Sequence, residues 1–354
     1  MGGGTAADGP LTFEELALAT RNRGMPLEAL RYDVTPTGLH YLLVHFDIPV
    51  IDAGMWRLNV GGMVTHPLSL SLDDIRAMPS VTHTVTMECA GNGRARLTPR
   101  PLSQPWLHEA IGTAQWTGTP LRGVLQRAGL RDGVADVVFT GADRGVQGDV
   151  EQDYARSLTP EDAMHDDALL VYEMNGEPLP PQHGFPLRLI VPGWYGMTSV
   201  KWLRSIEAID HAFDGFQQAA AYRYQRDEDD PGEPVRRIRA RALMVPPGIP
   251  EFFTRKRLLD AGRVTLGGRA WCGVAPVARV EVGIDGEWFD ATLEGEAGPY
   301  AWRAWRFDWV ATPGEHVLAC RATDAAGITQ PESQPWNVQG MGNNLIQSME
   351  ITVR

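Results

Sequence analysis

A charged, proline-rich break divides this chain into two parts with different hydrophobic patterns. Residues 226–240 read RDEDDPGEPVRRIRA, and residues 244–250 read MVPPGIP. Proline fixes φ and lacks a backbone N–H, so this composition disfavours both helix and central strand. Helical and strand-like runs are mixed before the break, whereas short alternating runs follow one another after it. We therefore expect an α+β protein, with a mixed α/β domain, a linker over 226–250 and an all-β sandwich.

The N-terminal part begins with MGGGTAADGP, which we expect to be a flexible leader. Thr12 and Glu15 form a capping-box pattern before a helix over 12–22, in which Phe13, Leu16 and Ala17 share one face. We assign residues 1–34 to the leader and this helix, 35–225 to the first domain and 251–354 to the second. Further expected elements are strands at 39–49, 81–89 and 136–143, strands beginning at Trp56, Ala168 and Phe185, helices capped by Ser71 and Thr159, a helix over 121–128 that ends at Gly129, and a hairpin at Asp285–Gly286.

The bulk composition excludes some classes of protein. The 354 residues carry a formal net charge of −12, which argues against nucleic acid as a partner. No apolar run approaches the roughly 20 residues that span a bilayer. No export signal is visible, which predicts a cytoplasmic location, although a trimmed periplasmic protein would look the same. Three cysteines do not make a disulfide framework. Cys272 and Cys320 are expected to be buried free thiols, although spacing leaves their pairing open.

One cysteine has an informative setting. Residues 81–89, VTHTVTMEC, alternate strictly, so Cys89 lies at the exit of a predicted strand. The following AGNGR, residues 90–94, contains two glycines and an asparagine, which favour a loop with unusual backbone angles. A lone cysteine on a strand is more often a small core residue, so this pattern does not establish a site.

Three segments of the chain, taken together, are more informative than the setting of Cys89 alone. TMECAGNGR, AIGTAQWTGTPLRGVL and VYEMNGEPLPPQHGFPLRLIVPGWYGMTSVKW closely resemble the molybdenum domain of sulfite oxidases and plant-type nitrate reductases. The later segments GRAWCGVAPVARVEVGIDGEWFDATL, AWRAWRFDWV and PWNVQG resemble the dimerisation domain of that family, an immunoglobulin-like sandwich. The resemblance covers roughly residues 35–354. It implies a molybdenum–molybdopterin cofactor and a homodimer, and we expect no haem domain.

The resemblance also implies roles for single residues. Cys89 matches the thiolate that binds molybdenum, and a soft anionic sulfur suits such a metal. His45 matches a histidine at the cofactor. Four further positions match residues of the family, although each of them, taken alone, could also be a turn residue or a solvated charge. The positions that match residues holding the pterin and its phosphate are Asp143, His183, Arg188 and Lys201.

Arg94 matches an arginine on the substrate side of the family's active site. The alternative is that Arg94 forms a structural ion pair. Tyr222 is the best match to an active-site tyrosine, but the spacing leaves Tyr224 and a plain packing role open. Sulfite oxidases carry arginines at two positions where this chain has Leu43 and Gln339. Three explanations remain open: compensation by Arg94 or Arg223, a less charged substrate, or a shifted alignment.

We therefore expect a molybdenum enzyme that catalyses two-electron oxo transfer, most simply sulfite to sulfate. An external electron carrier, such as a c-type cytochrome, would accept the electrons. Leu43 and Gln339 favour an alternative, an S- or N-oxide reductase or an organosulfur oxidoreductase on the same fold. A third alternative is a non-catalytic binding protein. The retention of Cys89 with His183, Arg188 and Lys201 argues against it.

Overall fold

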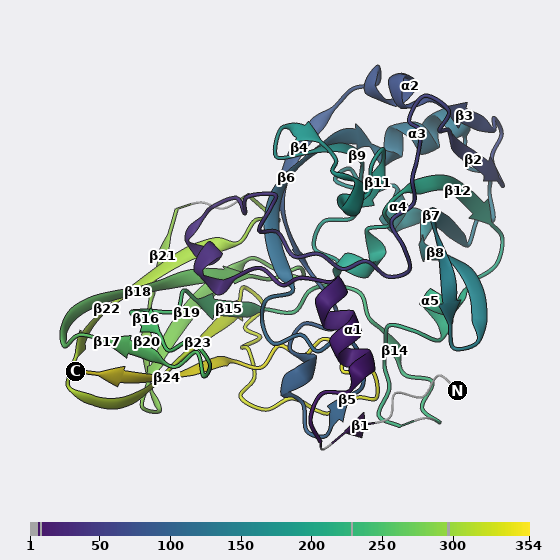
Figure 1. Cartoon of the computed structure of the whole chain (residues 1–354). Helices are drawn as coiled ribbons and strands as arrows, with labels where there is room; N and C mark the ends of the chain where they lie inside the picture. The colour runs from purple at the N-terminus through teal and green to yellow at the C-terminus, as the bar shows by residue number, and fades with distance from the viewer. Residues whose placement is uncertain (1–5, 8, 228, 296–297) are drawn as a thin grey trace.

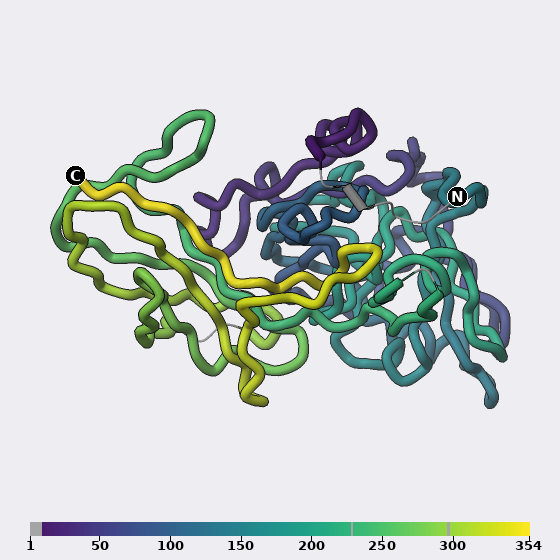
Figure 2. The backbone as a smooth tube through the Cα atoms, turned by 90° about the horizontal axis from the view of Figure 1, so that it is seen from below, coloured from purple at the N-terminus to yellow at the C-terminus, as the bar shows by residue number. Residues whose placement is uncertain are grey.

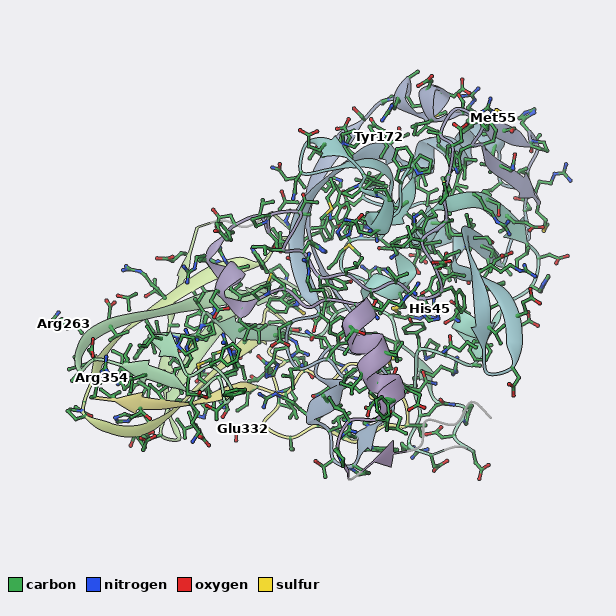
Figure 3. The ribbon with its side chains drawn as sticks, in the orientation of Figure 1. His45, Met55, Tyr172, Arg263, Glu332 and Arg354 are labelled. Carbon is green, nitrogen blue, oxygen red and sulfur yellow. The ribbon has the colours of Figure 1, made fainter. Side chains whose placement is uncertain are left out.

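The computed structural model describes residues 6–7, 9–227, 229–295 and 298–354. A mixed α/β domain and a β-rich domain lie side by side (Figure 1), in agreement with the expected fold class. Met55 and Tyr172 mark the outer part of the first domain, and Arg263 and Arg354 mark the far end of the second (Figure 3). His45 lies between these extremes, in the central part of the molecule.

The first domain contains two five-stranded sheets. In one, the order is β10-β9-β6-β4, and β11 also pairs with β9; in the other it is β3-β2-β12-β7-β8. The strands of the first sheet are β4 (Val81–Glu88), β6 (Ile111–Pro120), β9 (Leu169–Met174), β10 (Glu177–Pro178) and β11 (Arg188–Ile190). Those of the second are β2 (Leu58–Gly62), β3 (Leu68–Leu70), β7 (Asp136–Gln147), β8 (Val150–Leu158) and β12 (Leu203–Ile209).

Short capped helices connect these strands. Helix α3 (Leu121–Ala128) buries its apolar face and ends at Gly129, whose φ of +71° makes the left-handed cap that the sequence predicts. Ser71 and Thr159 cap helices as predicted. The other helical elements are α1 (Phe13–Arg21), α2 (Leu72–Arg76), α4 (Pro160–Ala163), α5 (Phe216–Ala219), η1 (Leu27–Arg31), η2 (Arg94–Arg96), η3 (Pro181–His183) and η4 (Gly196–Thr198).

Helix α1 has the predicted capping box, in which the Thr12 hydroxyl accepts from the Glu15 N–H. Its apolar face, however, is not buried: Phe13 is 88% exposed and Leu16 43%. The buried side is polar instead. Glu15 is buried and pairs with Arg100 at 2.9 Å, so an ion pair attaches the helix to the domain.

Two expectations for the first domain need correction. The run at 39–49 forms no strand: it is a loop in which Leu42 makes a single bridge to Arg23. Its apolar residues turn toward a cavity rather than toward a neighbouring strand, as described below. Strand β7 continues beyond the expected end at residue 143 to Gln147, because β8 returns beside it and pairs with it.

The second domain is a sandwich of a four-stranded sheet, β15-β18-β22-β21, and a six-stranded sheet, β16-β17-β24-β23-β19-β20. The predicted hairpin at Asp285–Gly286 has the positive φ angles of 51° and 92° that its turn requires. The strands are β15 (Arg241–Met244), β16 (Ile249–Pro250), β17 (Arg257–Leu259), β18 (Gly262–Trp271), β19 (Val277–Ile284), β20 (Glu287–Asp290), β21 (Thr292–Glu294), β22 (Arg303–Ala311), β23 (Gly314–Asp324) and β24 (Gln347–Val353).

The expected linker over 226–250 is too long. Strand β15 lies inside this range and pairs with β18, so the sandwich begins before residue 251. Strand β16 also pairs, at a sheet edge where proline is tolerated. The linker carries β14 (Glu233–Pro234), which pairs with β13 (Arg223–Tyr224). Most of the expected leader, residues 1–5 and 8, lies outside the described residues; β1 (Ala6–Ala7) pairs with β5 (Arg100–Pro101).

The last strand, β24, lies between β17 and β23 and runs along the sandwich to its far end, away from the first domain (Figure 2). All three cysteines are free. Cys320 is buried as expected, whereas Cys272 is only half-buried. Within the described part of the chain, none of the helices is long and apolar enough to cross a bilayer.

Candidate active site

Cys89 follows the last residue of β4 and begins a tight turn. The Cys89 N–H donates to the Ala110 carbonyl at 2.9 Å, and the Asn92 N–H donates to the Cys89 carbonyl at 2.9 Å. Gly93 has a φ of +87°, which an alanine would adopt only with strain. The alternation of the strand and the glycines of the turn therefore present the thiol at the strand exit, as the sequence predicts.

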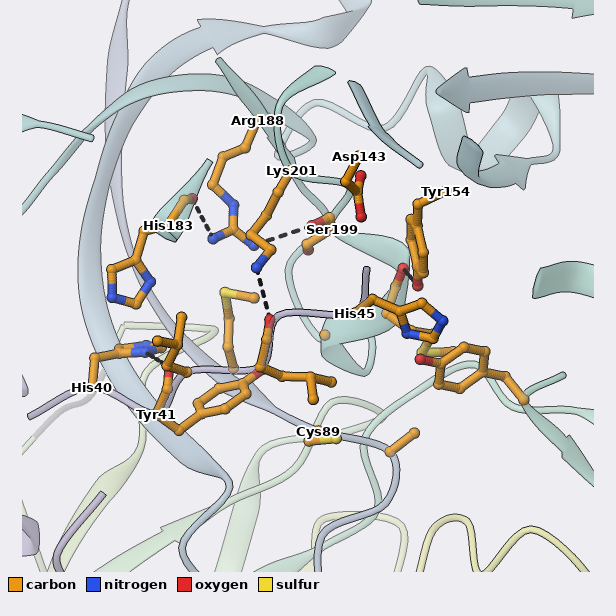
Figure 4. A pocket seen from close by; sticks show the side chains of 17 residues that line it. His40, Tyr41, His45, Cys89, Asp143, Tyr154, His183, Arg188, Ser199 and Lys201 are labelled. Atoms are coloured by element: carbon orange, nitrogen blue, oxygen red, sulfur yellow. Dashed lines mark hydrogen bonds between the residues drawn. The ribbon is translucent and has the colours of Figure 1, made fainter. Parts of the chain in front are cut away.

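The predicted site residues come together around one cavity (Figure 4). Arg94 lies outside this cavity but lines an adjoining one, and Cys89, His45, Leu43 and Tyr222 line both. The predicted residues that line the first cavity are His45, Cys89, Asp143, His183, Arg188, Lys201 and Tyr222.

Two cations, Arg188 and Lys201, face the first cavity. The Arg188 guanidinium donates to the carbonyls of His183, at 2.9 Å, and Ser199, at 3.1 Å. The Lys201 ammonium donates to the carbonyls of Leu43, at 2.7 Å, and Gln182, at 3.3 Å. Neither makes an ion pair within the described part of the chain. A phosphate in this cavity would supply the missing negative charge.

Burial shifts the pKa of these groups. It lowers the pKa of Arg188 to about 10, and burial together with Arg188 lowers the pKa of Lys201 to about 7. Burial raises the pKa of the Asp143 carboxyl to about 6, although Lys201 opposes the shift. Each shift indicates that the charged form of the group has too little solvent or opposite charge around it in the protein alone.

The histidines of the cavity are neutral. Burial, and then His40, lower the pKa of His183 to about 2, and burial lowers the pKa of His40 to about 4. The His40 Nε2 atom is buried without a hydrogen-bond partner among the described residues. The His45 Nε2 atom lies 2.7 Å from the Gln147 Oε1 atom. Neutral rings with a free nitrogen suit hydrogen bonds to a polar cofactor.

Arg94 occupies the floor of the second cavity. It is 5% exposed, its Nε donates to the Gln339 carbonyl at 2.8 Å, and its Nη1 donates to the Gln104 carbonyl at 3.2 Å. No carboxylate pairs with it in the described part of the chain, so the structure gives no support to a structural ion pair. The guanidinium packs so tightly under the turn that a Cβ on Gly91 would lie 2.6 Å from it.

The structure separates the two candidate tyrosines. Tyr222 lines both cavities, whereas Tyr224 lines neither and packs under the Arg239 guanidinium, 4.4 Å from the ring centroid. Burial raises the pKa of the Tyr222 phenol to about 12. Tyr222 has a φ of +56°, which is unusual for a bulky residue and common at functional sites.

The two departures from the family pattern both face the second cavity. Leu43 and Gln339 both line it. Arg223 does not line either cavity: its side chain donates to the carbonyls of Pro231, at 2.5 Å, and Gly232, at 2.7 Å. The structure therefore gives no support to compensation by Arg223.

Several cavity residues were missed by the sequence reasoning. His40 and Tyr41 lie in the loop that was expected to be a strand. Tyr154 comes from β8 and donates to the Met197 carbonyl at 2.8 Å. Trp106 lines the second cavity beside Cys89. Burial raises the pKa of the Cys89 thiol, while Arg94, and to a smaller extent Trp106, lower it. None of these residues lies in a sequence pattern that would identify it as a site residue.

The uncompensated cations, the free imidazole nitrogen and the thiol at one cavity fit a molybdenum–pterin cofactor with its phosphate. Comparisons agree. The sequence profile of the oxidoreductase molybdopterin binding domain matches residues 45–217, and that of the Mo-co oxidoreductase dimerisation domain matches residues 241–354. The chain is 33% identical to mitochondrial sulfite oxidase of Mus musculus, over 98% of this chain and 67% of that protein.

Two further relatives widen this comparison. Nitrate reductase [NADH] 1 of Oryza sativa subsp. japonica is 30% identical over 90% of this chain and 38% of its own length. Among solved structures, the sulfane dehydrogenase SoxCD from Paracoccus pantotrophus matches with a TM-score of 0.81 and 26% identity. That match covers 99% of this chain and 95% of the other.

Proposed function

Because this chain belongs to the sulfite oxidase family of molybdenum-cofactor oxidoreductases, we propose that it oxidises sulfite to sulfate by two-electron oxo transfer. The balanced reaction takes one sulfite and one water and yields sulfate, two protons and two electrons. The observation that carries the proposal is Arg94: a buried guanidinium that forms no ion pair with any described residue and shares a cavity with Cys89. Such a group is suited to a small oxyanion. Because the family match identifies a molybdenum-dependent oxidoreductase, the alternative of a non-catalytic binding protein is excluded.

Each cofactor-facing residue has a proposed task. Cys89 is the thiolate ligand of molybdenum, and the soft sulfur donor suits the metal. Arg188 and Lys201 neutralise the phosphate, and Asp143 and His183 hold the pterin by hydrogen bonds. His45 orients the cofactor from the side of Gln147. When bound, the cofactor supplies the two-electron couple, while the protein holds and tunes it.

On the substrate side, Arg94 binds an oxygen of the anion and stabilises negative charge as it develops. Tyr222 stays protonated at neutral pH because burial raises its pKa to about 12, so its hydroxyl can donate a hydrogen bond to the reacting oxygen. The two electrons leave to an external carrier, such as a c-type cytochrome. The dimerisation-domain match supports a homodimer.

A second candidate rests on a specific observation. Leu43 and Gln339 give the substrate cavity two uncharged side chains, and much of the remaining lining is apolar. Such a cavity also suits an organosulfur compound or an S- or N-oxide with an apolar group, and the enzyme would then act as an oxidoreductase of that class. The apolar residues that line this cavity include Leu18, Leu102, Trp106, Phe216, Val338 and Met341.

The test combines metal analysis with an assay. Wild type, Cys89→Ser and the control Cys272→Ser are purified from a host that makes the cofactor, and molybdenum is measured by plasma mass spectrometry. We expect about one molybdenum per chain in wild type and control, loss in Cys89→Ser, and sulfite-dependent ferricyanide reduction. Metal without sulfite turnover would favour the second candidate, and S- and N-oxides would be assayed next. Absence of metal from wild type would overturn both.

A further inference from the structure

The turn that carries Cys89 rests on the sandwich domain. Glu88, the residue before Cys89, is fully buried and its side chain points away from the cofactor cavity. Its Oε1 atom forms an ion pair with Arg241 Nε at 2.8 Å, and its Oε2 atom accepts a hydrogen bond from Trp271 Nε1 at 2.8 Å. Arg241 belongs to β15 and Trp271 to β18, so both partners come from the second domain.

The same carboxylate reaches the turn itself. The Glu88 Oε1 atom also accepts from Asn92 Nδ2 at 3.0 Å, and Asn92 Oδ1 accepts from the Ala110 N–H at 3.1 Å. Asn92 lies three residues after Cys89 and closes the turn by its own N–H, which donates to the Cys89 carbonyl. Glu88 is therefore shared between the cysteine turn on one side and the sandwich on the other.

A second set of contacts holds the turn from the same domain. The Gly342 N–H donates to the Ala90 carbonyl at 2.7 Å, and Asn343 Nδ2 donates to the Gly93 carbonyl at 2.6 Å. The Arg241 guanidinium donates to the Asn343 carbonyl, so one arginine joins this segment to Glu88. The carbonyls of Ala90 and Gly93 thus accept hydrogen bonds from the second domain.

We propose that Arg241 and Trp271 are positioning residues for the Cys89 thiolate and act through Glu88. The inference rests on the proposed role of Cys89 as the metal ligand. Because a buried carboxylate without its donors is costly, Glu88 fixes the end of β4 only where Arg241 and Trp271 meet it. The sandwich therefore sets the direction of the thiolate as well as forming the dimerisation domain. A shift of that domain would move the ligand.

The decisive variant is Trp271→Phe, which removes one N–H and keeps an aromatic ring. The matched control is Trp305→Phe: Trp305 is also buried in the sandwich, but its N–H has no partner among the described residues. Alkylation of Cys89 by iodoacetamide is followed by peptide mass spectrometry on the cofactor-free chain, with buried Cys320 as the internal reference. This readout requires neither metal nor substrate, so it stays informative if the proposed function fails.

We expect Trp271→Phe to alkylate several-fold faster than wild type, because the turn opens, whereas Trp305→Phe matches wild type. In the loaded protein, Trp271→Phe should lose molybdenum on dialysis roughly tenfold faster and shift the Mo(V) electron paramagnetic resonance signal. Glu88→Gln provides a second, isosteric variant with the same expected direction. Equal behaviour of Trp271→Phe and Trp305→Phe, whether both changed or both unchanged, would overturn the proposal.

Discussion

The side-chain oxygen of Gln339 accepts a hydrogen bond from the backbone N–H of Tyr222 at 2.8 Å. Tyr222 has a φ of +56°, and Gln339 belongs to the segment that enters the last strand of the sandwich. The Gln339 side-chain N–H groups also donate to the Ala220 carbonyl and to Gln225. Gln339, where the family resemblance led us to expect an arginine, thus holds the backbone of Tyr222 in place, and its side-chain amide is fully occupied.

Tyr222→Phe should lower kcat about a hundredfold or more, because it removes a hydroxyl that faces the cavity beside Cys89. Tyr224→Phe is the matched control and should leave kcat unchanged, since Tyr224 packs against Arg239 away from both cavities. Steady-state kinetics with sulfite and ferricyanide decide between them. A larger effect at Tyr224 would reverse the assignment.

Leu43→Arg should lower the KM for sulfite about tenfold, because a charge-assisted hydrogen bond to the anion contributes about 1.5 kcal/mol or more. Leu43 is the better position for this change, since Gln339 has structural partners. Val146→Arg adds the same charge at an exposed site of the cavity rim and should have little effect. An unchanged KM in Leu43→Arg would indicate that sulfite is not bound there.

Gly91→Ala should raise the KM for substrate while molybdenum is retained. The added Cβ would lie 2.6 Å from the Arg94 guanidinium and displace it, whereas the thiol of Cys89 stays in place. Gly123→Ala is the control, because a Cβ at this helical position meets nothing within 4 Å. Metal analysis and sulfite kinetics on the same samples separate substrate binding from cofactor loss; loss of metal would contradict the prediction.

The stability of the cofactor-free protein should rise between pH 7 and 9. The pKa of Lys201 falls from 10.5 to about 7 on folding, so in this range the unfolded chain binds more protons than the folded one. The free energy of unfolding therefore increases with pH as the buried ammonium loses its charge. Urea titrations should show that Lys201→Met removes this slope. Lys256→Met, at an exposed ion pair with Glu350, should keep it; an unchanged slope in Lys201→Met would exclude this cause.

Local patterns that depend only on neighbouring residues could be predicted from the sequence. The alternation of 81–88 and the glycines after Cys89 specify a strand and a turn wherever they lie in the molecule. The end of α3 at Gly129 and the hairpin at Asp285–Gly286 follow in the same way, because each depends on backbone angles that glycine permits. The resemblance to the sulfite oxidase family then supplied the candidate residues, and all of them except the alternatives Tyr224 and Arg223 lie at the two adjoining cavities.

Other features depended on partners far away in the chain. The run at 39–49 has the composition of a strand, but no neighbouring strand pairs with it, and its side chains line the cofactor cavity instead. Phe13 and Leu16 share a helical face that stays exposed, because Glu15 finds Arg100 on the other side. Strand β15 was assigned to the linker, since only its pairing with β18 shows that it belongs to the sandwich.

The sequence by itself determined the two domains, the strand and turn around Cys89, and the set of chemical groups available to a molybdenum cofactor. The tertiary structure decided which groups meet. It placed Tyr222 rather than Tyr224 at the two cavities, gave Arg94 no ion pair among the described residues, and placed Glu88 between Arg241 and Trp271. The physical reason is that burial and charge compensation are properties of surroundings assembled from distant segments, whereas turns and caps are set by a few neighbouring residues.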